Sequence, residues 1–257
     1  MMYNSVLVRY SEIGTKSRQT RKKWENILIH NIKEYLEVDF GNIFCSRGRI
    51  VILTGKKCDL KNIFGVVSFS PAVMIEQDME RIKEKAGEIY SGKKFRVSAK
   101  RITKEFPYSS RRINEIVGEH LVKKGGKVDL EDFEEEIGIE FLNHYVYIYK
   151  EKIKGPGGLP VGVQGRVLCF LEDEKDIKAA YLMLKRGCEI DYCGRNPKEL
   201  YKYSVGHKIH EYNKETKYIF AVSGKSLDNF EELLETKKRI EDKYRMKTLF
   251  PMLINYD

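Results

Sequence analysis

The sequence predicts an α+β fold in three parts, and three patterns support this prediction. Residues 1–71 show the order strand, helix, two strands and helix. Residues 72–154 combine amphipathic helices with strictly alternating strands, and residues 155–257 follow a glycine-rich stretch and alternate strand with helix. At 257 residues, 42% hydrophobic and 33% charged, the chain can bury a core in two or three small domains.

The first part opens with the short apolar strand 5–10, and a turn-prone stretch leads into a helix with Ser17 or Thr20 as its N-cap. Two further strands surround the turn at Arg47 and Gly48, and a short helix is expected over 59–64. This order is typical of a ferredoxin-like domain, which we expect to close near residue 71. The first helix should bury the residues that recur at helical spacing, which are Trp24, Ile27, Leu28, Ile32 and Leu36.

The second part begins with a helix over 75–89 and continues with a strand over 95–100. Alternation along this strand places Phe95, Val97 and Ala99 toward the core. Another helix should start at Ser109 or Ser110, and residues 137–149 should form one long strand or a hairpin. Gly155 to Gly158 is interpreted as a linker.

The third part is expected to be a small α/β domain with a parallel sheet. Its predicted elements are a strand over 167–171, a helix over 175–186, a strand over 218–223 and a helix over 227–244. Because strands and helices alternate, each crossover should return the chain to a parallel strand. The part is too short for a complete nucleotide-activating domain of the pyrophosphatase type.

Composition points to a reduced compartment and a polyanionic partner. The 47 Lys and Arg against 38 Asp and Glu give a net charge of +9 and favour nucleic acid. Five cysteines, an odd number, indicate free thiols in a cytoplasm. The N-terminus lacks the apolar core of a signal peptide, and no apolar run reaches the ~20 residues of a membrane span.

Basic residues gather on strand 95–100 and at its exit, and others lie in the first turn of the helix that follows. The stretch from Phe95 through Phe106-Pro107 to Gly118-Glu119 resembles the signature of the THUMP domain, an RNA-binding module of tRNA-modifying enzymes. Cations beside a helix N-terminus suit phosphates, although a solvated charged face is the alternative interpretation. The RNA-binding residues expected here are Arg96, Lys100, Arg101, Lys104, Arg111 and Arg112.

The N-terminal stretch 8–18, Val-Arg-Tyr-Ser-Glu-Ile-Gly-Thr-Lys-Ser-Arg, resembles the opening of the tRNA 4-thiouridine synthetase (ThiI) family. The resemblance implies that a ferredoxin-like domain and a THUMP domain together bind tRNA at the 3′ end of its acceptor stem, through single-stranded contacts and shape. Basic residues at the start of the first helix would extend this surface. They are Lys16, Arg18, Arg21 and Lys22.

Residues 157–167 and 179–189 resemble the same family, whose active members carry Ser-Gly-Gly-x-Asp-Ser between these flanks. Glycines let backbone N–H groups approach a phosphate closely, whereas carboxylates at that point repel it. Acid in a first helical turn stabilises the helix instead. When the motif is aligned without gaps, none of its residues is matched. The positions it covers are Leu171, Glu172, Asp173, Glu174, Lys175 and Asp176.

We therefore expect a tRNA-binding accessory of 4-thiouridine-type modification that has lost ATP-dependent adenylation. On this interpretation the chain is not an enzyme and has no catalytic residue, cofactor or metal. Its partners would be tRNA, a modification enzyme and a second copy of itself. The first alternative is an active tRNA sulfurtransferase with a non-standard nucleotide site.

A second alternative is a zinc-stabilised interaction protein. The spacing of a Cys2His2 site is approached by Cys188, Cys193, His207 and His210, with too few residues between the histidines.

Residues 222–226 end like a phosphate-binding Walker A loop, but Ile219 occupies the position of its first glycine. These residues are therefore expected to cap a helix and not to bind a nucleoside triphosphate.

Overall fold

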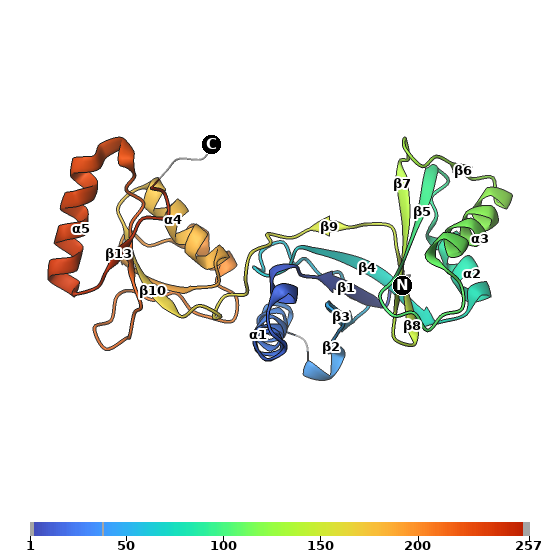
Figure 1. Ribbon diagram of the computed structural model, residues 1–257, viewed down its shortest axis with the longest axis horizontal. Coiled ribbons are helices and arrows are strands. Elements are labelled where there is room, and N and C mark those ends of the chain that lie inside the picture. Colours follow the sequence, from blue (N-terminus) through green and yellow to red (C-terminus); the bar gives the residue numbers. More distant parts are fainter. Residues whose placement is uncertain (1–2, 38, 254–257) are drawn as a thin grey trace. The chain divides into compact units, whose positions relative to one another are not determined.

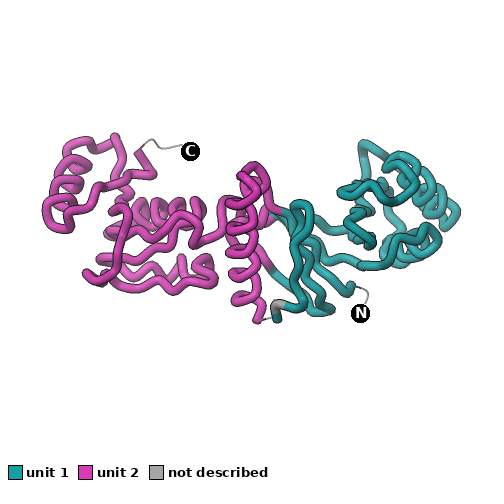
Figure 2. The backbone as a smooth tube through the Cα atoms, turned by 60° about the horizontal axis from the view of Figure 1, so that its bottom comes forward, with its two compact units in different colours: residues 1–9, 39–59, 68–154 teal, residues 10–38, 60–67, 155–257 magenta. Residues whose placement is uncertain are grey.

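The computed structural model describes residues 3–37 and 39–253, which fall into two compact units (Figure 1, Figure 2). Unit 1 comprises Met1–Arg9, Asp39–Asp59 and Ser68–Lys154. Unit 2 comprises Tyr10–Val38, Leu60–Val67 and Gly155–Asp257. Among the described helices, none is both long and apolar enough to cross a membrane.

Unit 1 is built on a sheet of nine strands with the order β2-β3-β1-β4-β8-β7-β5-β6, in which β9 pairs with β4. The pairs β5–β6 and β5–β7 are parallel, and the other described pairs of this sheet are antiparallel. The strands are β1 (Ser5–Arg9), β2 (Ile43–Ser46), β3 (Arg49–Leu53), β4 (Ser68–Glu76), β5 (Lys94–Arg101), β6 (Lys127–Val128), β7 (Glu135–Leu142), β8 (Tyr145–Tyr149) and β9 (Ile153–Lys154).

Two amphipathic helices, α2 (Met79–Ile89) and α3 (Ser110–Lys123), cover one face of this sheet. The core between them and strands β4, β5, β7 and β8 contains Phe95 and Val97 of β5. Ser109 caps α3 by accepting a hydrogen bond from the N–H of Arg112 (3.2 Å). The polar side chains that alternate with Phe95 and Val97 therefore point away from this core.

The opposite face of the unit 1 sheet buries a carboxylate between two arginines. Glu140 of β7, 3% exposed, accepts from Arg9 Nε (2.8 Å) and Arg49 Nε (2.7 Å), and Tyr149 donates to it (3.0 Å). β3 and β7 lie four places apart in the strand order, so this contact requires a curled sheet. Burial alone would raise the pKa of Glu140, but the two guanidiniums lower it overall.

Unit 2 contains a four-stranded, fully parallel sheet with the order β11-β10-β12-β13. Its strands are β10 (Arg166–Leu171), β11 (Glu189–Gly194), β12 (Ala221–Val222) and β13 (Thr248–Leu249). The helix α4 (Glu174–Lys185) connects β10 to β11, and α5 (Phe230–Tyr244) connects β12 to β13. Because these right-handed crossovers run in opposite directions, the two helices lie on opposite faces (Figure 1).

The helix α1 (Arg18–Leu36) belongs to unit 2 and contacts its loops. Ser17 caps it by accepting from the N–H of Thr20. Asn31, fully buried, donates to the carbonyl of Val161 (3.0 Å). Gly65 has φ +97°, which favours glycine, and a Cβ there would lie 3.0 Å from Pro160 and 3.2 Å from Leu28.

Most elements appear where the sequence places them. Confirmed elements are the first strand, the capped first helix, the hairpin around Gly48, the basic strand β5, the hairpin β7–β8, the helices α3, α4 and α5 and the parallel sheet. The boundaries 1–71, 72–154 and 155–257 stay a prediction. Pro71 lies inside β4, which pairs with β1 on one side and β8 on the other.

Three local predictions are wrong. Residues 59–64 form turns and no helix, since a seven-residue segment ending at the positive φ of Gly65 is too short to propagate one. The helix expected from residue 75 begins at Met79, after β4 and the capping residue Asp78. The strand expected over 218–223 is confined to Ala221–Val222, and β11 and β13 were not foreseen.

The Glu140 cluster yields a stability prediction. Glu140→Gln leaves Arg9 and Arg49 buried without a counter-charge, so the free energy of unfolding should fall by about 3–5 kcal/mol in a urea titration. Glu136→Gln removes only the part-exposed partner of Arg96 and should cost under about 1 kcal/mol. Equal losses for both variants would contradict this interpretation.

The pH dependence should follow from the same carboxylate. Its pKa is lower in the folded than in the unfolded chain, so its contribution is present above the ordinary carboxyl range and is lost as pH falls through the lowered value. The difference in unfolding free energy between the native chain and Glu140→Gln should therefore shrink in acid. A difference independent of pH would exclude this mechanism.

Candidate nucleic-acid interface and phosphate-loop segment

The acidic run 171–176 forms the junction between β10 and α4. β10 ends at Leu171, and Asp173 is the N-cap of α4. Asp173 accepts from the N–H of Asp176 (3.0 Å), and Asp176 accepts in return from the N–H of Asp173 (3.2 Å). This reciprocal capping box satisfies the N–H groups of Asp173 and Asp176, two of the donors that a helix N-terminus can offer to an anion.

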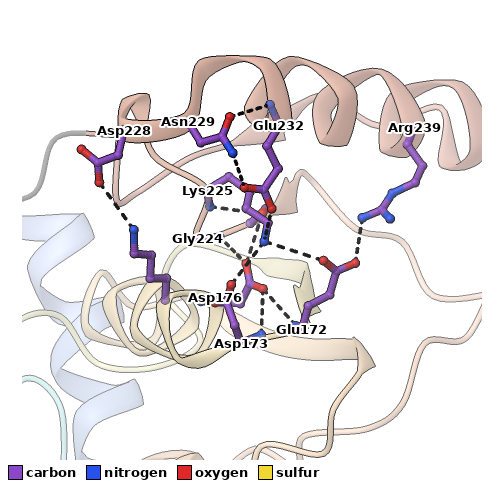
Figure 3. A network of polar contacts seen from close by, with 11 residues as sticks. Glu172, Asp173, Asp176, Gly224, Lys225, Asp228, Asn229, Glu232 and Arg239 are labelled. Carbon is purple, nitrogen blue, oxygen red and sulfur yellow. Dashed lines mark hydrogen bonds and ion pairs between the residues drawn. The ribbon is translucent and has the colours of Figure 1, made fainter.

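Asp176 is the buried centre of a polar network (Figure 3). The residue is 1% exposed, and one carboxylate oxygen accepts from the N–H groups of Glu172 (2.9 Å) and Asp173. The other oxygen accepts from Ser223 Oγ (3.1 Å) and the N–H of Gly224. Both oxygens are therefore saturated by the chain's own donors, and the side chain links β10, α4 and the segment after β12.

The segment 223–225 packs directly on the first turn of α4. A Cβ on Gly224 would lie 2.2 Å from the carbonyl carbon of Lys175, so only glycine permits this approach. Lys225 extends its Nζ to Glu232 (2.8 Å), Asp173 (3.2 Å) and Glu172 (3.8 Å). Its side chain is largely buried.

The electrostatics of this network are complementary. The hydrogen bond to Glu232 raises the pKa of Lys225 despite the opposing effect of burial. Burial favours a higher pKa for Asp173, but the N–H of Asp176 and the Lys225 ammonium lower it overall. Glu172 also accepts from Arg239 of α5 (2.8 Å). The carboxylates of the run are thus balanced mainly by internal cations.

This network occupies the crevice in which open parallel sheets place their ligands. From β10 the chain proceeds to β11 on one side of the sheet, and β12 lies on the other side. The crevice between the carboxyl ends of β10 and β12 is therefore the topological switch point. Asp173, Asp176, Gly224 and Lys225 all lie there.

The position of Asp176 also sharpens the comparison with the phosphate-loop motif. Moved one residue toward the C-terminus, Ser-Gly-Gly-x-Asp-Ser covers 172–177 and its aspartate falls on Asp176. The glycine positions then hold Asp173 and Glu174. In this register only the aspartate of the motif is matched, and the two positions at which the motif's glycines would approach a phosphate still hold acidic residues.

In unit 1, two of the predicted RNA-binding arginines have structural contacts. Arg96 forms an ion pair with Glu136 (2.9 Å) and stacks 3.8 Å from the ring centre of Phe133. Arg101 donates to the carbonyls of Phe106 (3.1 Å) and Tyr108 (2.8 Å) and holds the loop that leads to α3. These arginines order the surface from which their neighbours project.

The two arginines of the first turn of α3 share one carboxylate. Arg111 contacts Glu115 at 3.0 Å and Arg112 contacts it at 3.1 Å. Hydrogen bonds from Arg112 and Arg111 lower the pKa of Glu115. All three side chains are exposed, so the guanidiniums keep donors that an external phosphate can reach.

Lys100 and Lys104 are the exposed predicted cations of unit 1 that have no ion pair or hydrogen bond within the described chain. Lys100 is the outward residue near the end of β5, and Lys104 follows on the loop that Arg101 holds. Among the residues of unit 1 that are predicted to bind RNA, these two lysines therefore have charges that no described neighbour neutralises.

The four predicted cations of unit 2 lie at the start of α1 or immediately before it. Arg21 donates to the carbonyls of Gly14 (2.7 Å) and Lys16 (3.3 Å) and so braces the preceding turn. Lys16 lies 5.2 Å from the ring centre of Trp24. Arg18 and Lys22 are exposed and unpaired among the described residues.

The described side chains do not assemble a metal centre. No group of three or more His, Cys, Asp or Glu among residues 3–37 and 39–253 is placed to hold an ion. Cys188 is buried in the unit 2 core, and burial raises the pKa of its thiol to about 11. His207 contacts Glu189 (3.3 Å), and Cys193 contacts Tyr244 (3.5 Å). The zinc alternative gains no support.

The segment 223–225 was not foreseen as part of this site. The sequence suggested a helix cap for residues 222–226, and Ser226 does precede the short helix Leu227–Asn229 without a side-chain capping bond. The sequence does contain one indication of this contact, because the hydroxyl, N–H and ammonium groups of a Ser-Gly-Lys loop after one strand can bond to carboxylates that follow the neighbouring strand. Sequence spacing alone does not pair these two segments.

Comparison with known proteins defines the class. Residues 5–70 match the ThiI ferredoxin-like domain and residues 76–151 match the THUMP domain. A probable tRNA sulfurtransferase of Thermococcus kodakarensis is 41% identical over 207 residues, covering 74% of this chain and 54% of that protein. The chain belongs to the ThiI-like THUMP-domain family, and it spans about half the length of the curated relatives it matches.

Two solved structures extend the comparison. PH1313 from Pyrococcus horikoshii is 35% identical with a TM-score of 0.86, covering 99% of this chain and 96% of its own. A 4-thiouridine synthetase crystallised with RNA and ATP is 29% identical with a TM-score of 0.63 over 74% of this chain and 52% of its own.

The expectation that the chain is not an enzyme is wrong. Curated relatives are named probable tRNA sulfurtransferases and one similar solved structure is a 4-thiouridine synthetase, and both names denote enzymes. The expectation relied on one six-residue segment, whereas the similarity to these enzymes extends over about three quarters of the chain.

The Asp176 network predicts a stability loss at this junction. Asp176→Asn keeps the shape of the side chain but directs an NH2 group at two backbone N–H donors. The free energy of unfolding should therefore fall by roughly 2–4 kcal/mol. Glu174→Gln changes an exposed carboxylate in the same helical turn. Its free energy of unfolding should stay within about 0.5 kcal/mol of that of the native chain. Urea unfolding followed by circular dichroism measures both, and a silent Asp176→Asn would contradict the network.

Proposed function

We propose that this chain binds tRNA through its THUMP surface and serves tRNA modification of the 4-thiouridine type. The exposed cations on and after β5 carry this proposal, because Lys100 projects from the end of the strand and Lys104 from the loop that Arg101 holds in place. Uncompensated lysines on an ordered surface release counterions when they meet phosphates. The names of the sulfurtransferase relative and of the RNA-bound synthetase support tRNA as the polyanion.

Recognition of the acceptor-stem 3′ end is the finer part of the proposal. A single-stranded end offers splayed bases and a flexible backbone to a surface that has both cations and aromatic side chains. Tyr108 is exposed at the end of the loop that Arg101 holds, beside the first turn of α3. Arg111 and Arg112 lie on that turn, so these side chains can engage phosphate and base together.

We further propose that segment 171–176 is a structural clamp that does not bind ATP. The N-terminus of α4 is capped by Asp173 and Asp176, and Gly224 leaves no space at its first turn. A triphosphate there would have to displace internal hydrogen bonds and approach several carboxylates. If the modification uses an activated nucleotide, that nucleotide is bound away from this junction. The cytoplasmic location stays a prediction.

Titration with tRNA at several salt concentrations tests the proposal. The double variant Lys100→Ala, Lys104→Ala should weaken binding and lower the slope of log affinity against log salt by about 1.4–1.8, at roughly 0.7–0.9 per phosphate contact. Lys214→Ala is the matched control, because Lys214 is an exposed lysine of unit 2 outside the proposed surface. It should leave the slope unchanged.

Two outcomes separate the parts of this proposal. Absence of salt-sensitive binding to intact tRNA would reject tRNA as the ligand. Equal affinity for intact tRNA and tRNA lacking its 3′ end would retain tRNA and reject recognition of the acceptor end.

A further inference from the structure

A groove of about 670 Å³ lies between α3 and the outer edge of β5 in unit 1. Its wall includes Phe95 and Val97 of β5 together with apolar side chains that are open to solvent. These are Val122, Val128 and Leu130, which are 46%, 43% and 69% exposed. The volume falls within the roughly 300–1,000 Å³ of sites that hold small organic groups. A contiguous apolar surface of this kind marks a binding site.

β5 has free backbone groups on its side away from β7. β7 pairs with β5 along most of its length, whereas β6 pairs with its first two residues. On that outer side the carbonyl of Phe95 accepts from the N–H of Asp129 (2.9 Å), and the N–H of Ala99 donates to Asn114 Oδ1 (2.7 Å). Alternation along the strand directs the N–H and C=O of Val97 to the same side. Neither group has a partner among the described residues.

This free pair suits a nucleobase better than a peptide strand. An added strand needs a run of free N–H and C=O groups, but the bonds at Phe95 and Ala99 close both sides of Val97. A base presents a donor and an acceptor side by side on its pairing edge, so it can satisfy Val97 alone. The amide NH2 of Asn114 has no described partner either and adds a donor at the groove.

Gly118 opens the floor of the groove. It lies in the middle of α3, and a Cβ there would meet nothing within 4 Å. Glycine inside a helix is less stable than alanine, and no packing within the described chain excludes a methyl group at this position. The missing side chain allows a flat ring to approach the backbone of α3 closely.

The charges along the groove are complementary to a nucleotide. Arg111 and Lys123 lie at its two ends, in the first and last turns of α3, where they can contact phosphates. Glu119 lies between them, is exposed and forms no ion pair among the described side chains. A carboxylate accepts a hydrogen bond from the amino group of cytosine or adenine, whereas it repels the carbonyl that uracil has in that place.

We propose that this groove binds an unpaired RNA base that carries an exocyclic amino group, such as cytosine or adenine. The base lies over Gly118 and against Val122, and its pairing edge meets the N–H and C=O of Val97. The second hydrogen of its amino group is donated to Glu119. This inference rests on the proposed RNA-binding function, and it adds base selectivity to a surface whose lysines contact phosphates.

Binding of oligocytidylate and oligouridylate of equal length tests the proposal with the intact chain. Fluorescence anisotropy should give an affinity at least about fivefold higher for oligocytidylate. Gly118→Leu fills the groove and should remove this preference while the salt dependence of binding stays the same. Gly118→Ala is the matched control, because its methyl group meets no neighbour, and it should keep the preference. Far-UV circular dichroism verifies that each variant is folded.

Glu119→Gln tests the contact to the amino group without filling the groove. It should lower the preference for oligocytidylate several-fold, whereas Glu84→Gln, at an exposed position of α2, should not. A preference that persists in both Gly118→Leu and Glu119→Gln would overturn the assignment of this groove.

The same titrations separate this inference from the proposed function. Salt-sensitive binding of both oligonucleotides with equal affinity would overturn base selectivity and retain RNA binding. Failure to bind either oligonucleotide while intact tRNA binds would overturn the inference as well. Failure to bind tRNA too would reject the proposed function.

Discussion

The carboxylate of Asp176 is the constraint on which unit 2 depends. It accepts hydrogen bonds from Glu172 and Asp173 at the end of β10 and from Ser223 and Gly224 after β12. One buried charge thereby fixes the start of α4, the separation of two neighbouring parallel strands and the course of the loop between β12 and α5. Each donor is a backbone or hydroxyl group, so dipoles stabilise the charge of Asp176, while the ammonium of Lys225 bonds to the neighbouring Asp173.

This arrangement explains why a phosphate site and an acidic run can occupy the same place in related folds. A helix N-terminus at a switch point stabilises negative charge, whether the charge belongs to a ligand or to the protein. In this chain the negative charge at the switch point belongs to side chains, and Lys225, from the segment after β12, pairs with one of them, Asp173. The same physical preference is thus met by groups within the chain. In unit 1 the opposite holds, since Lys100 and Lys104 have no ion-pair partner among the described side chains.

Local patterns predicted the parts of this molecule that depend on neighbouring residues. The caps Ser17 and Ser109, the alternation along β5 and the acid at the start of α4 all follow from sequence and were confirmed. The pairing of Glu140 with Arg9 and Arg49, and of Lys225 with Asp173, joins residues far apart in the chain. Such contacts depend on strand order and sheet curl, which sequence periodicity does not encode. For the same reason, only the folded chain shows which residues expected to bind RNA have internal contacts, as Arg21, Arg96 and Arg101 do, and which are exposed and unpaired among the described residues, as Arg18, Lys22, Lys100 and Lys104 are.

Calorimetric titration of the chain with ATP and Mg²⁺ tests the account of the 171–176 junction most directly. We predict no saturable heat, because the N–H groups of Asp173 and Asp176 at the start of α4 are already bonded and the crevice holds carboxylates. Stoichiometric binding that Lys225→Ala changes would place the nucleotide at this junction. That result would contradict the central claim that Asp176 and the 223–225 segment have taken the place of the phosphate.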